Sequence, residues 1–173
     1  ESGTQAGRAK QFESGTQARN TPAIAADKKN NVLVATNVKK HESKADAKTY
    51  DISITKLEAA SGRVEWAVEM TGDDYLAGAV AVDTADDVLI AGENNTNLFV
   101  SKLFSTNGSA VWSRQYGYEY QDHKQNEYQD LHQIAAMAVD SADNVLIAGR
   151  NNSRILVAKL AKADGSVMWA KHF

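Results

Sequence analysis

One pattern that recurs three times constrains the fold of this chain more than any other feature. Each copy runs from an aliphatic segment through an Asp-x-x-[Asp/Asn]-[Asp/Asn] turn into a second apolar segment, at residues 24–35, 80–91 and 137–148. A second block follows each time, in which a Lys-Leu pair precedes a Gly and then a Trp. The Leu-to-Trp spacing is nine residues in all three copies, at Leu57 and Trp66, Leu103 and Trp112, and Leu160 and Trp169. The chain is therefore a tandem repeat.

Each copy is predicted to form four β-strands. In the second copy the strands are expected at residues 77–83, 87–92, 97–104 and 109–116. The breaks between them hold Asp, Asn, Gly and Ser, which favour turns. Length differences fall in the connections, as a polar insert near residues 38–48 and an extension near 118–130. Insertions confined to connections are typical of a packed repeat.

The first strand of each copy favours a β-propeller over a β-sandwich. Residues 79–82 alternate Ala and Val rather than polar and apolar, so both faces of this strand are expected to be buried. Ala25, Ala81 and Ala138 suit a strand near a crowded central axis. A Trp on the last strand would fill the wedge that widens outward between blades. Four strands per roughly 40–50 residues is the blade pattern of propellers, whereas a β-solenoid, the weaker alternative, usually has shorter repeats.

The fold class predicted is all-β, a propeller of four-stranded antiparallel blades, with about three blades plus one strand of a preceding blade. Closed propellers typically have about 4–8 blades, so the ring is expected to be incomplete in this chain. The hexapeptide at residues 1–6 recurs at 13–18, either as a genuine duplication or as an uncertain assignment. The expected organisation is a partial outer strand and linker (1–21), a first blade (22–72), a second blade (73–117), a loop insertion (118–130) and a third blade (131–173).

The repeated residues resemble the SBBP type of β-propeller repeat. The second copy carries the resemblance at residues 80–83, 88–92, 99–103 and 108–117. The third copy is as close, and the first departs most, with Thr36 in place of a Gly. The resemblance covers about residues 23–173. It implies propeller blades, often in large secreted or surface-associated proteins, and it implies neither enzymatic activity nor a catalytic set of residues.

A more distant similarity links the chain to quinoprotein-like propeller repeats, which also end in a Gly-x-x-x-Trp segment such as residues 62–66. In quinoprotein dehydrogenases the cofactor needs a cation and a stacking site over the axis. Nothing in the sequence singles out such a site, so no cofactor is expected.

Composition excludes several classes of function. A net charge of −3 argues against a general nucleic-acid binder, which usually has a basic surplus. No apolar run approaches the roughly 18–20 residues that span a bilayer. The absence of Cys removes disulfides, thiolate metal sites and Cys nucleophiles. No Gly-x-Ser-x-Gly elbow, phosphate loop or His-Glu-x-x-His motif occurs. We therefore expect no catalytic residue and no metal site.

The acidic turns that begin at Asp27, Asp83 and Asp140 allow two interpretations. Clustered oxygens could bind Ca²⁺, but the turns lack the carboxylate that closes a full calcium loop. Asx side chains also satisfy hairpin backbone groups without an ion, and this structural interpretation is the favoured one. The repeated Trp residues are expected to fill the core. The repeated lysines, Lys56, Lys102 and Lys159, are expected to snorkel or to pair with an acid of a neighbouring blade.

The segment between the second and third copies is the candidate binding surface. Its residues Tyr118, Glu119, Tyr120, Asp122, His123 and Tyr128 could contact a ligand or partner, since Tyr supplies rigid amphipathic area. The alternative is a solvated surface loop. Sequons at Asn94, Asn107 and Asn151 could carry glycan if the protein is eukaryotic and secreted.

The function expected from the sequence is a non-enzymatic propeller scaffold or interaction module, a fragment of a larger extracellular, cell-surface or periplasmic protein. Its partner would be a protein, a glycan or further blades of the same protein, with no nucleic acid and no membrane span. One alternative is a structural subunit of a surface layer, filament or large complex, including a homo-oligomer, because open blade faces associate readily. A less favoured alternative is a cofactor-binding or catalytic propeller.

Overall fold

The computed structural model describes residues 22–39, 50–72, 75–94, 97–116, 133–151 and 154–173. These residues form three four-stranded antiparallel sheets, each with its strands in chain order, and contain no helix. Blade 1 consists of β1 (Ala23–Ala26), β2 (Val32–Lys39), β3 (Tyr50–Leu57) and β4 (Val64–Met70). Blade 2 consists of β5 (Tyr75–Val82), β6 (Val88–Asn94), β7 (Asn97–Leu103) and β8 (Ala110–Tyr116). Blade 3 consists of β9 (Gln133–Val139), β10 (Val145–Asn151), β11 (Arg154–Leu160) and β12 (Val167–His172).

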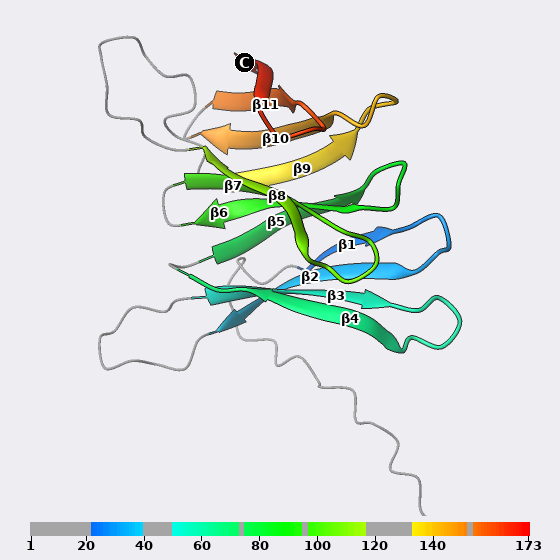
Figure 1. Cartoon of the computed structure of the whole chain (residues 1–173). Helices are drawn as coiled ribbons and strands as arrows, with labels where there is room; N and C mark the ends of the chain where they lie inside the picture. Colours follow the sequence, from blue (N-terminus) through cyan, green and yellow to red (C-terminus); the bar gives the residue numbers. More distant parts are fainter. Residues whose placement is uncertain (1–21, 40–49, 73–74, 95–96, 117–132, 152–153) are drawn as a thin grey trace, which may run out of the picture.

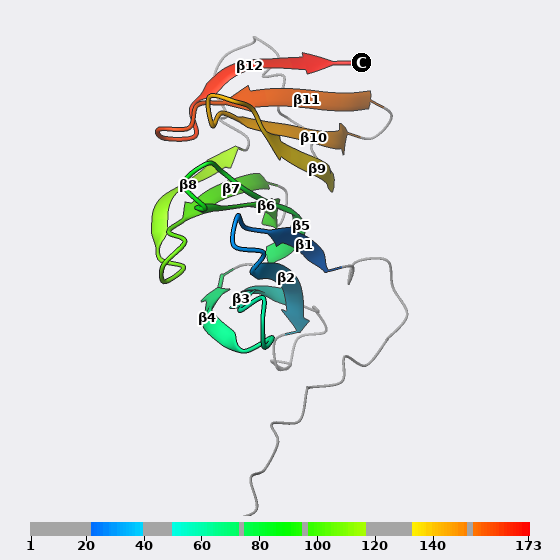
Figure 2. The ribbon, with the colours of Figure 1, turned by 90° about the vertical axis from the view of Figure 1, so that its right-hand side faces the viewer.

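The three blades stack in chain order, with blade 1 at the bottom of Figure 1 and blade 3 at the top. Their first strands, β1, β5 and β9, contact one another in succession and are the innermost strands. The blades do not close into a ring (Figure 2). The predicted all-β propeller with four-stranded antiparallel blades is therefore confirmed. The expected strand of a preceding blade lies outside the described residues.

Two apolar clusters hold the blades together, one at each contact between successive blades, which we call a seam. At the first seam, Leu33 and Ile54 of blade 1 pack with Val88 and Ile90 of blade 2. At the second seam, Leu89 and Ala91 of blade 2 pack with residues of blade 3 such as Val145 and Ile147. The middle blade is thus apolar on both faces of its sheet, and residues 88–91 are all buried.

Residues 79–82, whose strand is predicted to be buried on both faces, include the buried Ala79 and three half-buried side chains. The first strands of the two end blades are exposed on one face. Ile24 on β1 is 69% exposed, because it lies on the side of blade 1 that faces no other described blade. Ala138 on β9 is exposed for the corresponding reason on blade 3. Ala25 and Ala81 pack against the two seams. The neighbouring blade, rather than crowding at the axis alone, sets the burial of these positions.

Two kinds of turn recur in every blade. The acidic turn joins the first and second strands, and its fourth residue, Asn30, Asp86 or Asp143, has a left-handed φ of 63, 65 or 64°. Asn and Asp tolerate this conformation better than other non-Gly residues. The glycine turn joins the third and fourth strands, and Gly62, Gly108 and Gly165 have φ of 67, 71 and 74°. Left-handed backbone at these positions explains why Gly recurs at the same place.

A Trp–glycine contact closes each seam. The indole Nε1 of Trp66 donates a hydrogen bond to the carbonyl of Ser105 (2.9 Å), and that of Trp112 donates to the carbonyl of Lys162 (3.0 Å). A Cβ added at Gly108 would lie 2.8 Å from Cε3 of Trp66. The indole ring therefore lies directly under the glycine turn of the next blade. The prediction that the repeated Trp fills the wedge is confirmed for both residues, but Trp169 is 42% exposed because no described blade covers it.

Candidate functional site

The three acidic turns meet at one end of the innermost strands. They surround an open pocket of about 250 Å³, which brings the same repeat positions of all three blades together. The lining residues are Ala26, Lys28, Val82, Asp83, Thr84, Asp86, Val139 and Asp140. Because it is concave, carries charged side chains and is built by all three blades, this pocket is the candidate site.

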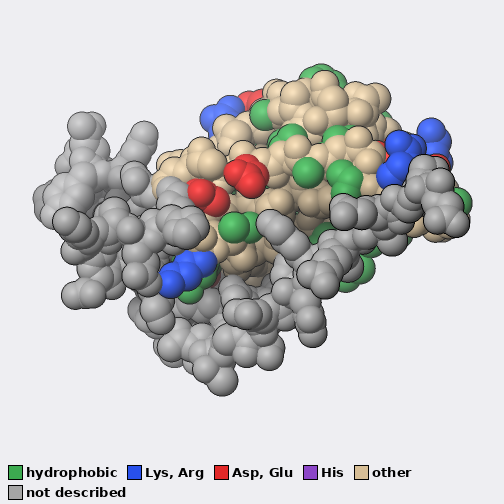
Figure 3. Space-filling view, turned by 90° about the horizontal axis from the view of Figure 1, so that it is seen from below, with side chains coloured by type: hydrophobic (Ala, Val, Ile, Leu, Met, Phe, Trp, Pro, Cys, Tyr) green, Lys and Arg blue, Asp and Glu red, His purple; other side chains and the backbone are tan. Residues whose placement is uncertain are grey.

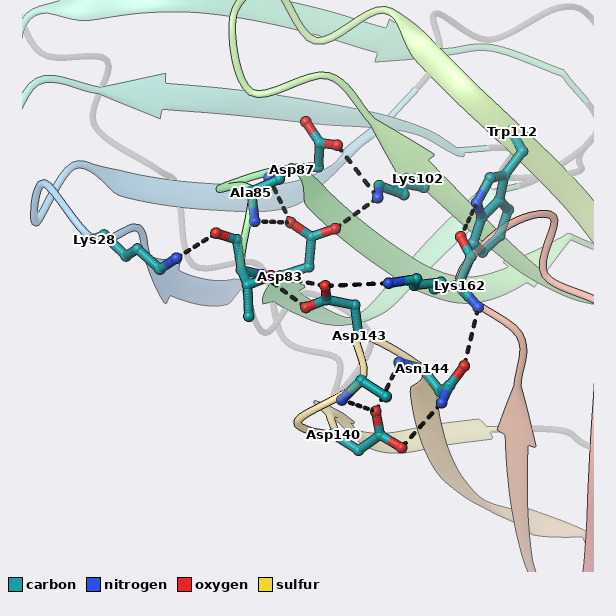
Figure 4. A network of polar contacts seen from close by, with 12 residues as sticks. Lys28, Asp83, Ala85, Asp87, Lys102, Trp112, Asp140, Asp143, Asn144 and Lys162 are labelled. Atoms are coloured by element: carbon teal, nitrogen blue, oxygen red, sulfur yellow. Dashed lines mark hydrogen bonds and ion pairs between the residues drawn. The ribbon is translucent and has the colours of Figure 1, made fainter.

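The first carboxylate of each acidic turn is bonded within its own hairpin. Oδ1 of Asp27 accepts hydrogen bonds from the backbone N–H groups of Lys29 (2.9 Å) and Asn31 (2.8 Å). Oδ1 of Asp83 accepts from Ala85 (2.8 Å) and Asp87 (3.0 Å), and that of Asp140 from Ala142 (2.9 Å) and Asn144 (2.8 Å) (Figure 4). This geometry is the one that the structural interpretation predicts.

The second oxygen of each of these carboxylates pairs with the repeated lysine. The Nζ–Oδ2 distances are 2.9 Å for Lys56 and Asp27, 2.6 Å for Lys102 and Asp83, and 2.7 Å for Lys159 and Asp140. The prediction that these lysines pair with an acid of a neighbouring blade is therefore wrong. The antiparallel register places the lysine on the third strand beside the acidic turn of its own sheet, so its side chain reaches that turn across the second strand.

These contacts hold the groups in their charged forms. Burial opposes the charge of Asp27, but hydrogen bonds from Lys56 and from two backbone N–H groups lower its pKa below the usual value. Burial also disfavours the charge of Lys102, yet Asp83 and Asp87 raise its pKa. The Lys159 ammonium lowers the pKa of Asp140, and Thr84 lowers that of Asp143. Such groups keep their charge at neutral pH, which suits ion pairing rather than proton transfer.

Polar bonds across the pocket also join successive blades. The backbone N–H of Lys28 donates to Oδ1 of Asp86 (3.1 Å), and its Nζ donates to the carbonyl of Thr84. At the next seam the N–H and hydroxyl of Thr84 donate to the two carboxylate oxygens of Asp143, at 3.0 and 2.7 Å. The sequence interpretation missed these contacts. The sequence does show that Asp86 and Asp143 occupy the same repeat position and so should make equivalent contacts. Spacing along the chain does not identify the residue of another blade that each one contacts.

Each acidic turn is linked to the glycine turn of the same blade. The last side chain of the acidic turn accepts a hydrogen bond from the backbone N–H of Ala59 (3.0 Å), Ser105 (3.0 Å) or Lys162 (3.3 Å). Ser105 and Lys162 are also the residues whose carbonyls accept the Trp bonds. Acidic turn, glycine turn and the preceding Trp thus form one network, drawn for Asn144, Lys162 and Trp112 in Figure 4.

Among the residues that the structure describes, no group of three or more His, Asp or Glu side chains is placed to hold a metal ion. The pocket offers acceptor oxygens and the Lys28 ammonium. These groups are already bonded within their hairpins and across the seams.

The residues predicted from the sequence as a binding surface, Tyr118, Glu119, Tyr120, Asp122, His123 and Tyr128, lie outside the described residues. Of the three sequons, Asn94 is half-buried at the end of β6, and Asn151 is the last residue of β10. Asn107 is exposed in the glycine turn of blade 2, where its Oδ1 accepts from the N–H of Ser109 (2.9 Å). Asn107 therefore has a structural role within its turn.

Comparisons with known proteins place the fold. No curated protein sequence matches the chain. Among 27 matching chains of solved structures is the quinohemoprotein alcohol dehydrogenase ADHIIG from Pseudomonas putida HK5, with a TM-score of 0.56. It is 15% identical, and the match covers 86% of this chain and 26% of that one. The chain thus spans about a quarter of that protein, and at this identity the likeness shows the propeller fold alone.

The model of one protein family matches residues 17–173, which include all the described blades. This match and the structural neighbour confirm the similarity to quinoprotein-like propellers; the SBBP assignment stays a prediction. No helix among the described residues is long and apolar enough to cross a membrane. The chain belongs to the family of PQQ-like propeller repeats described as outer membrane protein assembly factor BamB.

Proposed function

We propose that this chain is a non-enzymatic module of a larger propeller protein, and that it binds a protein or glycan partner at the cell surface or in the periplasm. One observation carries the proposal. The repeated Asp, Lys and Trp side chains at the pocket and seams are engaged in holding turns and blades together. These repeated side chains thus have a structural role, which leaves recognition to the surfaces and loops that differ between copies.

The family description supports the same role and location. It names an outer membrane protein assembly factor, which supports a role toward other proteins and a place near an outer membrane. The SBBP-type resemblance of the repeats points to secreted or surface-associated proteins as well. Both favour an interaction module over an enzyme.

The quinohemoprotein neighbour raises the second candidate, a cofactor-binding propeller. A quinone cofactor of this class needs a cation and an aromatic stacking partner over the axis. Trp66 and Trp112 lie between blades under the glycine turns instead. The first carboxylates of the acidic turns are already bonded to their own hairpins and lysines. These engaged side chains support the non-enzymatic candidate over the cofactor-binding one.

A titration of the purified chain with pyrroloquinoline quinone and Ca²⁺ tests this choice. Visible absorbance reports binding, and reduction of an artificial electron acceptor in the presence of a primary alcohol reports activity. We expect no saturable binding and no alcohol-dependent reduction. Saturable binding with turnover that is lost in Asp86→Asn would overturn the non-enzymatic proposal.

Binding to immobilised peptides from outer membrane proteins and to a glycan array tests the interaction role. We expect saturable binding to one of these classes, abolished when Tyr118, Tyr120 and Tyr128 are all replaced by Ser. The matched control is Val111→Ser, at a side chain that is 39% exposed on β8. Equal binding by the triple variant would contradict the assignment of the segment at 118–130 as the binding surface.

A third candidate, a subunit of a larger assembly, is supported by the apolar side chains exposed on the two ends of the stack, such as Ile24 and Ile155.

A further inference from the structure

We propose that the folded chain modifies itself at Asn107, where the glycine turn of blade 2 promotes conversion of the asparagine to aspartate and isoaspartate. No enzyme takes part, and water is the only co-reactant. The isoaspartate product then loosens the first seam. The site is the sequon Asn107-Gly108-Ser109, whose adjacent residues supply an electrophile, a nucleophile and two hydrogen-bond donors. The proposal does not depend on which partner the chain binds.

The described surface on the side of blade 1 carries no large patch of one charge. Figure 3 views the molecule from this side, and its Lys, Arg, Asp and Glu side chains lie in small separate groups among hydrophobic ones. At the axis, the repeated charged groups are bonded within their hairpins and across the seams. The carboxamide of Asn107, by contrast, lies on an exposed turn that water reaches.

The turn brings the Asn107 side chain over the peptide bond that follows it. Asn107 is the only asparagine in the sequence that precedes a glycine. Because Gly108 has no side chain, nothing on that residue hinders approach to its backbone nitrogen. The Oδ1 atom of Asn107 accepts a hydrogen bond from the N–H of Ser109 at 2.9 Å, which folds the side chain back in an Asx-turn. The carboxamide carbon is thereby held beside the Gly108 nitrogen.

The reaction begins with attack of the Gly108 backbone nitrogen on Cγ of Asn107. The nitrogen forms a new bond to Cγ and loses its proton to a solvent hydroxide. The bond from Cγ to Nδ2 breaks, Nδ2 takes up a proton from water, and ammonia leaves a cyclic imide behind. Water then cleaves this imide. Cleavage of the new bond to Cγ gives aspartate, and cleavage of the original peptide bond gives isoaspartate, in which the main chain runs through the side chain.

The turn also stabilises the negative charge that develops on Oδ1 during the attack. The backbone N–H and the hydroxyl of Ser109 donate to this atom at 2.9 and 2.8 Å. These distances lie within the roughly 2.7–3.1 Å at which positioned donors stabilise an oxyanion in acyl transfer. Before the attack, the same two bonds polarise the carbonyl and make Cγ a better electrophile.

One contact opposes the reaction. The N–H of Gly108 donates to the carbonyl of Phe104 at 2.9 Å, and ring closure breaks this bond. Loss of one such bond slows a step by roughly tenfold at most, whereas a positioned oxyanion donor in an enzyme accelerates acyl transfer by about 100-fold or more. About a tenth of that acceleration is enough, on this exposed turn, to offset the lost bond.

Blade 3 shows which product the turn accommodates. Asp164 occupies the position of Asn107, and its Oδ1 accepts from the N–H of Ser166 at 2.9 Å in the same way. Aspartate at position 107 should therefore preserve the turn. Isoaspartate instead adds a methylene to the main chain next to Gly108, where an added Cβ would lie only 2.8 Å from Cε3 of Trp66. This product should therefore displace the turn from the indole at the first seam.

Timed peptide mapping by mass spectrometry tests the proposal on the folded chain. Samples held at neutral pH are digested, and isoaspartate is identified by methylation with protein isoaspartate methyltransferase. We expect Asn107 to be converted at least about tenfold faster than any other asparagine, into a mixture of both products. Conversion that is no faster than at Asn144, which precedes a valine, would overturn the proposal.

Two hydroxyl variants separate the turn from the Asn-Gly sequence itself. Ser109→Ala removes one donor and should slow the reaction roughly two- to tenfold, and Ser109→Thr should restore it. The matched control, Ser166→Ala at the same position of blade 3, should leave the rate at Asn107 unchanged. In urea, where the turn is lost, Ser109→Ala and the wild type should react equally fast. Equal rates in the folded state, or a difference that persists in urea, would contradict a role of the turn.

The wild type provides a test that does not depend on whether Ser109→Ala folds, which circular dichroism melting establishes. Its Asn107 should be converted at least as fast in the folded state as in urea, and slower conversion in the folded state would overturn the proposal. Asn107→Asp should melt like the wild type. The isoaspartate form, separated by chromatography, should melt roughly 2–4 °C lower. An isoaspartate form that melts like the wild type would contradict the loosening of the first seam.

Discussion

The glycine turns of blades 1 and 3 have almost the same local structure and very different surroundings. In both, the Gly N–H donates to the carbonyl four residues earlier, of Glu58 at 2.8 Å and of Ala161 at 2.9 Å. Both glycines have left-handed φ, 67° at Gly62 and 74° at Gly165. Yet an added Cβ would meet open space at Gly62 and would lie 2.7 Å from Cζ3 of Trp112 at Gly165.

The difference separates two reasons for a glycine. The hairpin alone requires left-handed backbone, and this requirement acts in every blade. The seam adds a steric requirement, because the indole of the preceding blade takes the space of a side chain. Gly62 in blade 1 is therefore constrained only by its backbone conformation. Gly165 in blade 3 is constrained both by its backbone conformation and by the indole of Trp112. The substitutions below test whether the second constraint exists and how large it is.

The largest difference is expected between Gly165→Ala and Gly62→Ala. At Gly165 the change adds backbone strain and overpacking against Trp112, and we expect it to lower the free energy of unfolding by roughly 2–4 kcal/mol. At Gly62 only the strain applies, roughly 1 kcal/mol. Urea unfolding followed by circular dichroism, at a concentration low enough for the monomer, measures both. Equal losses in the free energy of unfolding would show that the Trp112 indole shifts to make room for the added methyl group.

Removing the indole instead of the glycine gives the next largest difference. Trp112→Ala takes away a half-buried ring and its hydrogen bond to Lys162, and we expect a loss of about 2–3 kcal/mol. Trp169→Ala removes a ring that faces solvent, and the loss should stay below about 1 kcal/mol in the monomer. The same urea unfolding experiment compares them. A large effect at Trp169 would mean that its ring already has a partner within the chain.

The acidic turns make stability depend on pH in the acid range. The pKa values of Asp27, Asp140 and Asp143 are lowered in the folded protein, so each contributes stability that is fully present above its unfolded value of about 4. That stability is lost as the pH falls from about 4 through the lowered folded values. The melting temperature should therefore change little between about pH 7 and 5 and drop below about pH 4. Asp140→Asn should flatten this drop, whereas the exposed Glu69→Gln should leave it unchanged.

The smallest effect is expected at the rim of the second seam. Arg114 donates to the carbonyl and the carboxylate of Asp164, at 2.7 and 2.8 Å, but both side chains are about half exposed. Exposed pairs of this kind contribute about 0.2–1 kcal/mol, so Arg114→Ala should lower stability by about 0.5 kcal/mol. The effect should shrink further at high salt, which a melting series in NaCl would detect. A salt-independent loss would point to packing of the Arg stem instead.

Much of the fold follows from periodicity within one repeat. The third strand of the second copy, expected at residues 97–104, is observed as Asn97–Leu103, because alternation and turn residues are local signals. The acidic turns follow their structural interpretation for the same reason. The backbone N–H groups that donate to Asp27 belong to residues two and four positions later in the chain, so a local sequence pattern is enough to predict these bonds.

Contacts between strands and blades were harder to predict. Lys56 pairs with Asp27 of its own blade, which depends on the register of three adjacent strands rather than on spacing. Trp112 and Trp169 have the same sequence surroundings, and only the presence of a next blade makes one half-buried and the other exposed. The bond from Thr84 to Asp143 crosses a seam and leaves no local pattern. The ion pair, the difference in Trp exposure and the bond between blades all depend on how strands and blades are placed in space, which the sequence of a single repeat does not specify.

A double-mutant cycle between Trp112 and Gly165 tests most directly whether the indole under the glycine turn joins the blades. The free energy of unfolding would be measured for the wild type, Gly165→Ala, Trp112→Ala and the double variant. If the contact is as described, Gly165→Ala should cost roughly 1–3 kcal/mol less in the Trp112→Ala background, because the collision is gone and only strain remains. An equal cost of Gly165→Ala in both backgrounds would contradict the account.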